Sequence, residues 1–513
     1  MENINASSSS SRKYAEKEAF VTGHDGTTPL EIFLLCLAVP IGLRVYSKLT
    51  TSSCCRVPKS KRYDYLIKVA IEFATLIVPN LLLQTSLLPY IIGPSALHVV
   101  MVILSCILPH NNDQQQSPKQ QTNNNNNNNN NNIIHRPPFL TVHRATIYIQ
   151  TAIAILAVDF PIFPRRYCKT EVGGYGWMDL GAASFIIIAG WSSSSSSSDS
   201  AASASTIATS MVKKAVIKCT PLFILGIIRL ISIKGMEYQE HVSEYGVHWN
   251  FFFTLCCVEG SMVLWRFVKK KCHFLSLTKL PWDGIVAVFL MILYQLYLSI
   301  GGGQEFIENG PRQCSSDDSA TTAWSLSLCS AFVANREGIL GIIGYLSLRL
   351  LSESMARYCI WPKVIEPKTV TNLRQWRLLL SSVAFWAAHY FLTSLLGVPN
   401  SRRSTNVPFI WWSLAQNTSV LCLIHFAMTS SSRSEPLLQH APRIFNSVNR
   451  FGLPVFFVSN ILTGLVNLLV DTIHSSNEKA MVVLTIYLMA VCGLALLLEN
   501  IFDKKRVVDK KVD

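Results

Sequence analysis

The chain has 513 residues, of which 50% are hydrophobic and only 15% are charged, and its mean hydropathy is +0.30. A soluble protein normally carries about a quarter charged residues, so this composition excludes an ordinary soluble enzyme. The net charge of +14 does not indicate nucleic-acid binding. Its basic residues fall in short loops between apolar blocks, as the positive-inside rule predicts for a membrane protein.

The apolar blocks indicate membrane-spanning helices. Residues 32–46, 285–300 and 481–498 are apolar for most of the thickness of a bilayer. A helix needs about 20 residues to cross the hydrocarbon, and lipid leaves only helices or closed barrels as spanning structures. Barrel strands would alternate in polarity, and these blocks do not. We therefore predict an all-α, polytopic membrane protein.

About thirteen transmembrane helices are expected between a polar tail at residues 1–28 and a charged tail at residues 503–513. The start of the chain has no evident cleavable signal peptide, so the first apolar block should act as an uncleaved anchor. Residues 29–502 then form one multi-span domain. The expected spans are 29–47, 64–86, 90–108, 140–158, 176–191, 213–233, 248–268, 282–300, 336–352, 374–396, 406–428, 450–471 and 479–502.

Two low-complexity segments interrupt the spans and are expected to be disordered loop insertions. Residues 109–133 are rich in Gln and Asn, and residues 192–210 are rich in Ser and Ala. Such compositions lack the apolar residues that a packed structure requires.

The distribution of Lys and Arg among the loops predicts the orientation. Alternate loops hold most of them, including Lys269, Lys270 and Lys271, and should be cytosolic. With thirteen spans, the N-terminus is then lumenal and the C-terminus cytosolic. Lys510 and Lys511 resemble a cytosolic dilysine retrieval signal for the endoplasmic reticulum. Asn5 begins a glycosylation acceptor sequence on the lumenal side.

The most unusual segment is residues 159–171, which follow the fourth span on the expected lumenal side. Asp159 lies at the membrane edge, two prolines then prevent the helix from continuing, and Arg165, Arg166 and Lys169 follow. Clustered cations on that side oppose the positive-inside trend. The segment is either an active-site loop for an anionic substrate or a loop whose long side chains pair with lipid phosphates.

Longer stretches around this segment resemble a known family. The loop continued through residues 176–181, together with residues 18–21, 229–253, 334–339 and 460–467, resembles the inositol acyltransferases of glycosylphosphatidylinositol (GPI) anchor synthesis, which include PIG-W. The resemblance implies transfer of a fatty acyl group, usually palmitoyl, from acyl-CoA to the inositol 2-hydroxyl of glucosaminyl-phosphatidylinositol. It also implies thirteen spans, an endoplasmic reticulum membrane location and no cofactor besides acyl-CoA as co-substrate.

Within the loop, the resemblance puts the family's catalytic pair on Asp159 and Lys169. A carboxylate can take the proton of an inositol hydroxyl as that hydroxyl attacks a thioester, and a cation can stabilise the negative charge on the carbonyl oxygen. The fork geometry of Arg165 and Arg166 suits phosphate binding. Cys168 offers a rival mechanism through an acyl-enzyme, although no His is adjacent to activate it.

A second polar cluster, residues 237–250, supplies further candidates. Its carboxylates and histidines, Glu237, Glu240, His241, Glu244 and His248, could form a metal site, but HExxH is absent and we predict no metal. A polar wall for the sugar head group and a structural hydrogen-bonded loop are the other interpretations. We expect His248, Asn250 and Arg229 to bind substrate.

Some polar residues leave two interpretations open. Arg229 and Glu259 lie within apolar spans, where a charge serves either function or pairing inside the helix bundle. Cys314 and Cys329 share one polar loop and can pair if that loop is lumenal. No protein partner is demanded by the sequence.

Two other functional classes compete with the acyltransferase. A multi-span lipid or solute transporter would be expected to contain inverted repeats, and the two halves of this chain show no internal similarity. A non-catalytic scaffold would not need Asp159 and Lys169 together. Alanine substitution separates the classes, because an enzyme loses turnover but keeps its fold.

Overall fold

The computed structural model is helical throughout the part of the chain that it describes. Within those residues, Gly26 and Tyr175 form an isolated parallel β-bridge, which belongs to no strand. The all-α prediction is confirmed. The predicted span 90–108, the Asn run and the polar residues Asn5, Glu237, Glu240 and His241 lie outside the described part. The structure describes residues 20, 22–51, 61–85, 136–193, 204–235, 242–272, 280–314, 323–361, 367–429, 438 and 440–512.

The chain divides into two compact units. Unit 1 comprises Met1–Phe33, Val158–Ser419 and Thr472–His474. Unit 2 comprises Leu34–Ala157, Val420–Asp471 and Ser475–Asp513. Every candidate site residue named above belongs to unit 1, so this unit contains the features that bear on function.

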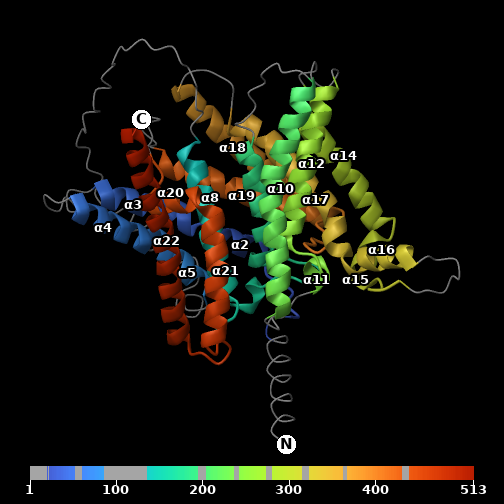
Figure 1. The fold of residues 1–513 in the computed structure, drawn as a ribbon, viewed down its shortest axis with the longest axis horizontal. Helices are drawn as coiled ribbons and strands as arrows, with labels where there is room; N and C mark the ends of the chain where they lie inside the picture. The colour runs from blue at the N-terminus through green and yellow to red at the C-terminus, as the bar shows by residue number, and fades with distance from the viewer. Residues whose placement is uncertain are drawn as a thin grey trace, which may run out of the picture. The chain divides into compact units, whose positions relative to one another are not determined.

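Unit 1 is a bundle in which α17 packs against α9, α12 and α14. α10 packs against α12, and Figure 1 shows these two helices side by side. Gly190 of α9 allows close packing, since an added Cβ would approach the Ser352 Cβ of α17 to 2.7 Å. The helices of this region are α9 (Leu180–Ser193), α10 (Ala204–Gly235), α11 (Val242–Tyr245), α12 (Phe251–Lys271), α14 (Trp282–Ser299), α15 (Gly303–Asn309), α16 (Ala323–Ala334), α17 (Arg336–Cys359), α18 (Pro367–Tyr390) and the start of α19 (Val407–Met428).

Unit 2 places α8 against α20, α21 and α22, and Figure 1 shows the last two running side by side. Buried polar pairs support this packing. Gln150 of α8 donates to the Asn80 side chain of α5 at 2.9 Å, and Glu72 accepts from the Phe445 amide at 3.1 Å. The helices of this region are the end of α2 (Pro29–Cys36), whose first residues belong to unit 1, and α3 (Ala38–Thr51), α4 (Lys61–Glu72), α5 (Val78–Gln84), α8 (Pro138–Ala157), α20 (Arg443–Arg450), α21 (Gly452–Leu469) and α22 (Asn477–Val512).

Ten helices in the described residues are long and apolar enough to cross a membrane. They correspond to ten of the thirteen predicted spans, nine of them to within a few residues at each end, whereas the helix Arg336–Cys359 ends seven residues after the predicted span 336–352. Of the other three, 90–108 is outside the described part, 176–191 corresponds to the 14-residue α9, and 213–233 lies within α10. The long helix α10 carries several cations and begins at Ala204, inside the segment expected to be a loop. The count of thirteen and the orientation remain predictions.

Large apolar side chains cover the outer faces of several of these helices. Ile217 of α10 is 62% exposed, Phe289 of α14 is 59% exposed and Leu380 of α18 is 63% exposed. A water-soluble surface would not carry so many, whereas a surface in contact with lipid tails requires them. The chain is therefore a multi-pass membrane protein.

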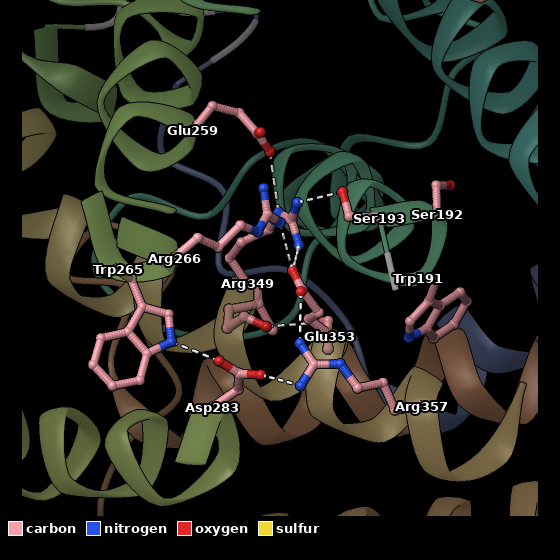
Figure 2. Close-up of polar contacts among 12 residues, drawn as sticks. Trp191, Ser192, Ser193, Glu259, Trp265, Arg266, Asp283, Arg349, Glu353 and Arg357 are labelled. Atoms are coloured by element: carbon pink, nitrogen blue, oxygen red, sulfur yellow. Dashed lines mark hydrogen bonds and ion pairs between the residues drawn. The ribbon is translucent and has the colours of Figure 1, made fainter. Parts of the chain in front are cut away.

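Charged side chains inside unit 1 form a connected network (Figure 2). Arg349 of α17 lies at its centre, with 1% of its side chain exposed. Its guanidinium is 3.1 Å from a carboxylate oxygen of Glu259 on α12, 3.1 Å from one of Glu353, and donates to the Ser193 hydroxyl of α9 at 2.8 Å. Lys218 of α10 is 2.9 Å from Glu259. The network therefore links four helices. Of the two interpretations left open for Glu259, the structure shows pairing inside the helix bundle.

Glu353 connects this centre to the end of α17. Arg266 of α12 and Arg357 of α17 lie 2.8 and 2.7 Å from its two oxygens. Arg357 also pairs with Asp283 at the start of α14, which is 2.6 Å from the Lys269 ammonium. Ion pairs that share partners in this way leave no carboxylate of the set alone in a low-dielectric bundle, where an isolated charge is costly.

A disulfide between Cys314 and Cys329 joins the segment after α15 to α16. The pairing that the sequence left open is therefore made. Because the bond closes a loop between residues 15 apart, chain entropy alone gives it about 3 kcal/mol of stabilisation.

We expect dithiothreitol to lower the Tm of the detergent-solubilised protein, since reduction frees that loop in the unfolded chain. The measurement is a thermal unfolding curve with and without reductant. A double variant, Cys314→Ser with Cys329→Ser, is the matched control and should have a low Tm that reductant does not change. An unchanged Tm for the reduced wild type would contradict the stabilising role.

Candidate functional site

Arg165 organises the loop that follows α8. Its guanidinium donates to the carbonyl oxygens of Val158 (2.9 Å), Phe160 (2.9 Å) and Phe163 (2.8 and 3.0 Å), and lies 4.1 Å from the centre of the Phe20 ring. These carbonyls belong to a turn in which prolines prevent helical hydrogen bonding, so the arginine replaces the missing donors. Burial lowers the pKa of Arg165. The Arg165 guanidinium is thus engaged by the loop itself.

Arg166 pairs with the N-terminal end of α2. Its Nε lies 2.9 Å from a carboxylate oxygen of Glu31, and the Tyr167 hydroxyl donates to the same oxygen at 2.7 Å. Burial and this hydrogen bond raise the pKa of the Tyr167 hydroxyl. The Arg166 side chain remains 43% exposed, so part of its fork is accessible beside the Glu31 pair.

Lys169 belongs to a row of four charged side chains, linked in the order Lys169, Glu244, Arg402 and Asp179. We call this row the Lys169 ring, because Asp179 is bonded to Thr170, the residue that follows Lys169. The Lys169 ammonium pairs with a carboxylate oxygen of Glu244, and Arg402 lies 3.9 Å from that same oxygen. The Nε of Arg402 is 2.9 Å from Asp179. Asp179 closes the ring, because it accepts from the Thr170 amide at 3.2 Å and from the Thr170 hydroxyl at 2.8 Å.

The two most buried members of the ring, Asp179 and Arg402, form an ion pair with each other. Asp179 is 0% exposed and the Arg402 side chain is 5% exposed. Burial alone would lower the pKa of Arg402, but Glu244 and Asp179 raise it overall, so the guanidinium stays charged. Gly176 donates to Asp179 at 2.8 Å and lies so close that an added Cβ would meet the Asp179 carboxylate at 2.7 Å. The ring therefore depends on a glycine at this position.

The segment 397–406 carries Arg402 and positions it beside Glu244 and Asp179. The Gly174 amide donates to the Asn400 carbonyl at 2.8 Å, and the Ser401 hydroxyl donates to the Val172 carbonyl at 2.9 Å. These contacts hold the segment against the loop that carries Lys169. The next residue, Arg403, lies 3.0 Å from Glu337 at the start of α17.

Glu337, at the start of α17, pairs with two arginines. Arg312 donates to both of its oxygens, at 2.7 and 2.8 Å, and Arg403 lies 3.0 Å away. The side chain of Glu337 is 0% exposed. Two consecutive arginines of the segment 397–406 are thus held by two different carboxylates, Asp179 and Glu337.

Asp159 and Lys169 both lie near the buried sulfur of Cys168. Burial raises the pKa of the Cys168 thiol above its ordinary value of 9.0, Lys169 opposes that rise and Asp159 adds to it. Asp159 is half-buried and also interacts with Arg165. One short loop therefore contains a carboxylate and an ammonium that both act electrostatically on the Cys168 thiol.

The Cys168 thiol itself is a poor nucleophile in this setting. It is 2% exposed, and its raised pKa keeps it protonated at neutral pH, whereas the thiolate is the reactive form. The geometry thus favours a structural role over the acyl-enzyme alternative.

We expect Cys168→Ser to keep most of the wild-type activity, because serine preserves the volume and no covalent intermediate is lost. Alkylation of Cys168 by iodoacetamide, followed by mass spectrometry across a pH series, is the accompanying measurement. Since the pKa is raised, modification should be slow at pH 7 and accelerate only above pH 9. Rapid modification at pH 7 together with an inactive serine variant would support covalent catalysis.

The remaining substrate-binding candidates occupy different positions. His248 is exposed, and its amide donates to the Asn335 side chain at 2.8 Å. Asn250 caps α12 by accepting from the Phe252 amide at 3.0 Å, and it donates to the Gly226 carbonyl at 2.9 Å. Arg229 is exposed on α10. None of these three side chains belongs to the Lys169 ring.

Comparison with known proteins gives the family of this helical, multi-pass chain. The GWT1 family model matches residues 13–498. The chain belongs to the GWT1 family. It is similar to GPI-anchored wall transfer protein 1 of Yarrowia lipolytica, with 35% identity over 374 residues, 70% of this chain and 72% of that protein.

Other GWT1 relatives match over nearly their whole length. GPI-anchored wall transfer protein 1 of Aspergillus fumigatus is 32% identical over 520 residues, 95% of this chain and 97% of that protein. The protein of that name in Candida albicans is 30% identical over 525 residues, 96% of this chain and 98% of that protein. The family resemblance that the sequence motifs indicated is thereby confirmed.

Sequence reasoning on this GWT1 chain missed Arg402 as a site residue and left Asp179 without a role. A signal was available. Arg402 and Arg403 are adjacent cations in a loop on the same expected side as residues 159–171, and so they also oppose the positive-inside trend. The reasoning from charge that selected the loop at residues 159–171 would also have selected them.

Proposed function

We propose that this GWT1-family chain transfers a fatty acyl group, palmitoyl in the first instance, from acyl-CoA to the inositol 2-hydroxyl of glucosaminyl-phosphatidylinositol in GPI-anchor biosynthesis. The observation that carries the proposal is one short loop that contains both Asp159 and Lys169 and whose lysine pairs with Glu244, in a chain whose relatives are named GPI-anchored wall transfer protein 1. The reaction is an O-acyl transfer by a membrane enzyme.

Asp159 acts as the general base in this mechanism. Its carboxylate takes the proton of the inositol 2-hydroxyl as the oxygen attacks the thioester carbonyl carbon. The C–O bond forms, and negative charge develops on the carbonyl oxygen. When the tetrahedral intermediate collapses, the C–S bond breaks and the CoA thiolate leaves, taking the proton back from Asp159.

Lys169 stabilises the developing oxyanion. Its ammonium is paired with Glu244 in the Lys169 ring and 36% of its side chain is exposed, so it can hold a second negative oxygen without leaving the loop. A preorganised cation at such a position is worth several kcal/mol, because it needs little reorganisation at the moment of reaction.

The two loop arginines have different roles in this proposal. Most of the Arg165 donors bind carbonyl oxygens, including those of Val158 and Phe160 on either side of Asp159. Arg165 therefore holds the backbone at Asp159 in place. Arg166 is the better candidate for a substrate phosphate, because its side chain is 43% exposed. His248, also exposed, is a candidate for contact with the sugar head group, and Arg229 for contact with phosphate.

We place the loop on the lumenal side of the endoplasmic reticulum membrane. Disulfides persist in oxidising compartments, and Cys314–Cys329 adjoins Arg312, which pairs with Glu337 at the start of α17. Arg357, at the other end of α17, lies in one network with Lys269. Oxidised cysteines at one end and basic residues at the other support this orientation.

The test uses purified protein in liposomes with palmitoyl-CoA and glucosaminyl-phosphatidylinositol. Release of free CoA is followed with a thiol reagent, with each substrate omitted in turn. Acyl transfer predicts CoA release that needs both lipid acceptor and protein. A transporter would move a substrate without releasing CoA, and such a result in folded protein would contradict the proposal.

A further inference from the structure

We infer that Arg402 is a positioning residue for Lys169, acting through Glu244 and Asp179 without touching the substrate. This inference rests on the proposed function, because it assigns a role in the same reaction. The Lys169 ring carries it, since Lys169 is held at two points and Arg402 joins both.

The first point of restraint is the Lys169 side chain. Its ammonium pairs with Glu244 on α11, a helix of a single turn that cannot fix its own side chains firmly. Arg402 lies 3.9 Å from the same Glu244 oxygen and is itself almost fully buried. The guanidinium therefore limits where the Glu244 carboxylate can lie, and the carboxylate limits where the ammonium can lie.

The second point of restraint is the backbone next to Lys169. Asp179 accepts from the Thr170 amide and hydroxyl and from the Gly176 amide, so it fixes the loop immediately after Lys169. Burial raises the pKa of Asp179, and the Arg402 guanidinium opposes that rise, so Arg402 favours the charged form of this fully buried carboxylate. One arginine thus secures both the side chain and the main chain of Lys169.

The charges of the ring balance only when Arg402 is present. Lys169 and Arg402 carry two positive charges, and Asp179 and Glu244 carry two negative charges. Without Arg402, the Glu244 carboxylate would attract the Lys169 ammonium more strongly and draw it away from the substrate carbonyl. The planar fork of arginine reaches two carboxylates at once, which a lysine at this position cannot reproduce.

The experiment is a double-mutant cycle on kcat for inositol acylation in liposomes. The variants are Arg402→Gln, Lys169→Gln and the two combined, with Arg402→Lys as the variant that keeps the charge. A displacement of about 1 Å at a catalytic group can cost about 100-fold, and we expect Arg402→Gln to lower kcat by about that factor with little change in KM.

Because Arg402 acts through Lys169, the double variant should be no slower than Lys169→Gln alone, to within about threefold. Arg402→Lys should recover part of the lost kcat. Arg403→Gln is the matched control, since Arg403 is the adjacent arginine and pairs with Glu337 instead. Its effect should multiply with that of Lys169→Gln.

Independent, multiplying losses for Arg402 and Lys169 would overturn the inference while leaving the acyltransferase intact. Silence of the wild type would instead refute the proposed function, so the two failures are distinct. If Arg402→Gln does not fold, the cycle is run with Arg402→Lys, whose kcat loss must likewise vanish in the Lys169→Gln background.

Discussion

Replacing Lys169 with glutamine is expected to lower kcat for inositol acylation by about 100- to 1000-fold, the loss seen when one group that stabilises an oxyanion is removed. Asp159→Asn should lower it by about 100- to 10,000-fold, because the inositol hydroxyl loses its general base. KM for acyl-CoA should change little in both variants. Initial rates of palmitoyl transfer in liposomes provide the measurement.

Glu171→Gln is the matched control for these two variants. Glu171 is a carboxylate of the same loop that accepts a hydrogen bond from the Gly23 amide at 3.2 Å and lies outside the Lys169 ring. It should leave kcat within a few-fold of the wild type. If Asp159→Asn and Lys169→Gln were folded and as active as Glu171→Gln, the assignment of the catalytic pair would be wrong.

The largest expected effect on stability is that of Glu353→Gln. Glu353 is 4% exposed at its side chain, and Arg266, Arg349 and Arg357 lie within 3.1 Å of its oxygens. Removing the negative charge leaves three cations facing one another inside the bundle. Breaking a buried ion pair in this way costs about 3–5 kcal/mol, so we expect a large fall in Tm.

An exposed pair gives the comparison for this variant. Lys68 and Asp64 lie 2.8 Å apart on α4, with about half of each side chain exposed. Solvent screens such a pair, and Asp64→Asn should change the stability by about 0–1 kcal/mol. Thermal unfolding in one detergent checks both variants. Equal Tm values for Glu353→Gln and Asp64→Asn would mean that the network in Figure 2 does not hold the bundle together.

The spans could be predicted from the sequence because a bilayer imposes a length and an apolar composition on any helix that crosses it. Residues 282–300, for example, were expected as a span, and α14 is Trp282–Ser299. The bounds of α10 were harder to predict from the sequence, because four cations interrupt its apolar pattern: Lys213, Lys214, Lys218 and Arg229. Lys218 is accommodated by Glu259 of α12, a contact that no local pattern contains.

The candidate site could be predicted only in part, for a similar reason. Charges that oppose the positive-inside trend indicated the loop at residues 159–171, which is a local signal. The partners of Lys169 lie elsewhere, with Glu244 on α11 and Arg402 in a segment between α18 and α19. These contacts depend on tertiary packing. The contact of Asn250 with the Gly226 carbonyl of α10 is likewise tertiary, and its expected role in substrate binding stays a prediction.

The most direct test of the account is the mass of glucosaminyl-phosphatidylinositol recovered from liposomes that contain the protein and palmitoyl-CoA. The lipid is supplied in two forms, with the inositol 2-hydroxyl and with that hydroxyl replaced by hydrogen. We expect the mass to rise by one palmitoyl group in the first form only. No rise in either form, with folded protein, would contradict acyl transfer, and a rise in both would contradict the 2-hydroxyl as the acceptor.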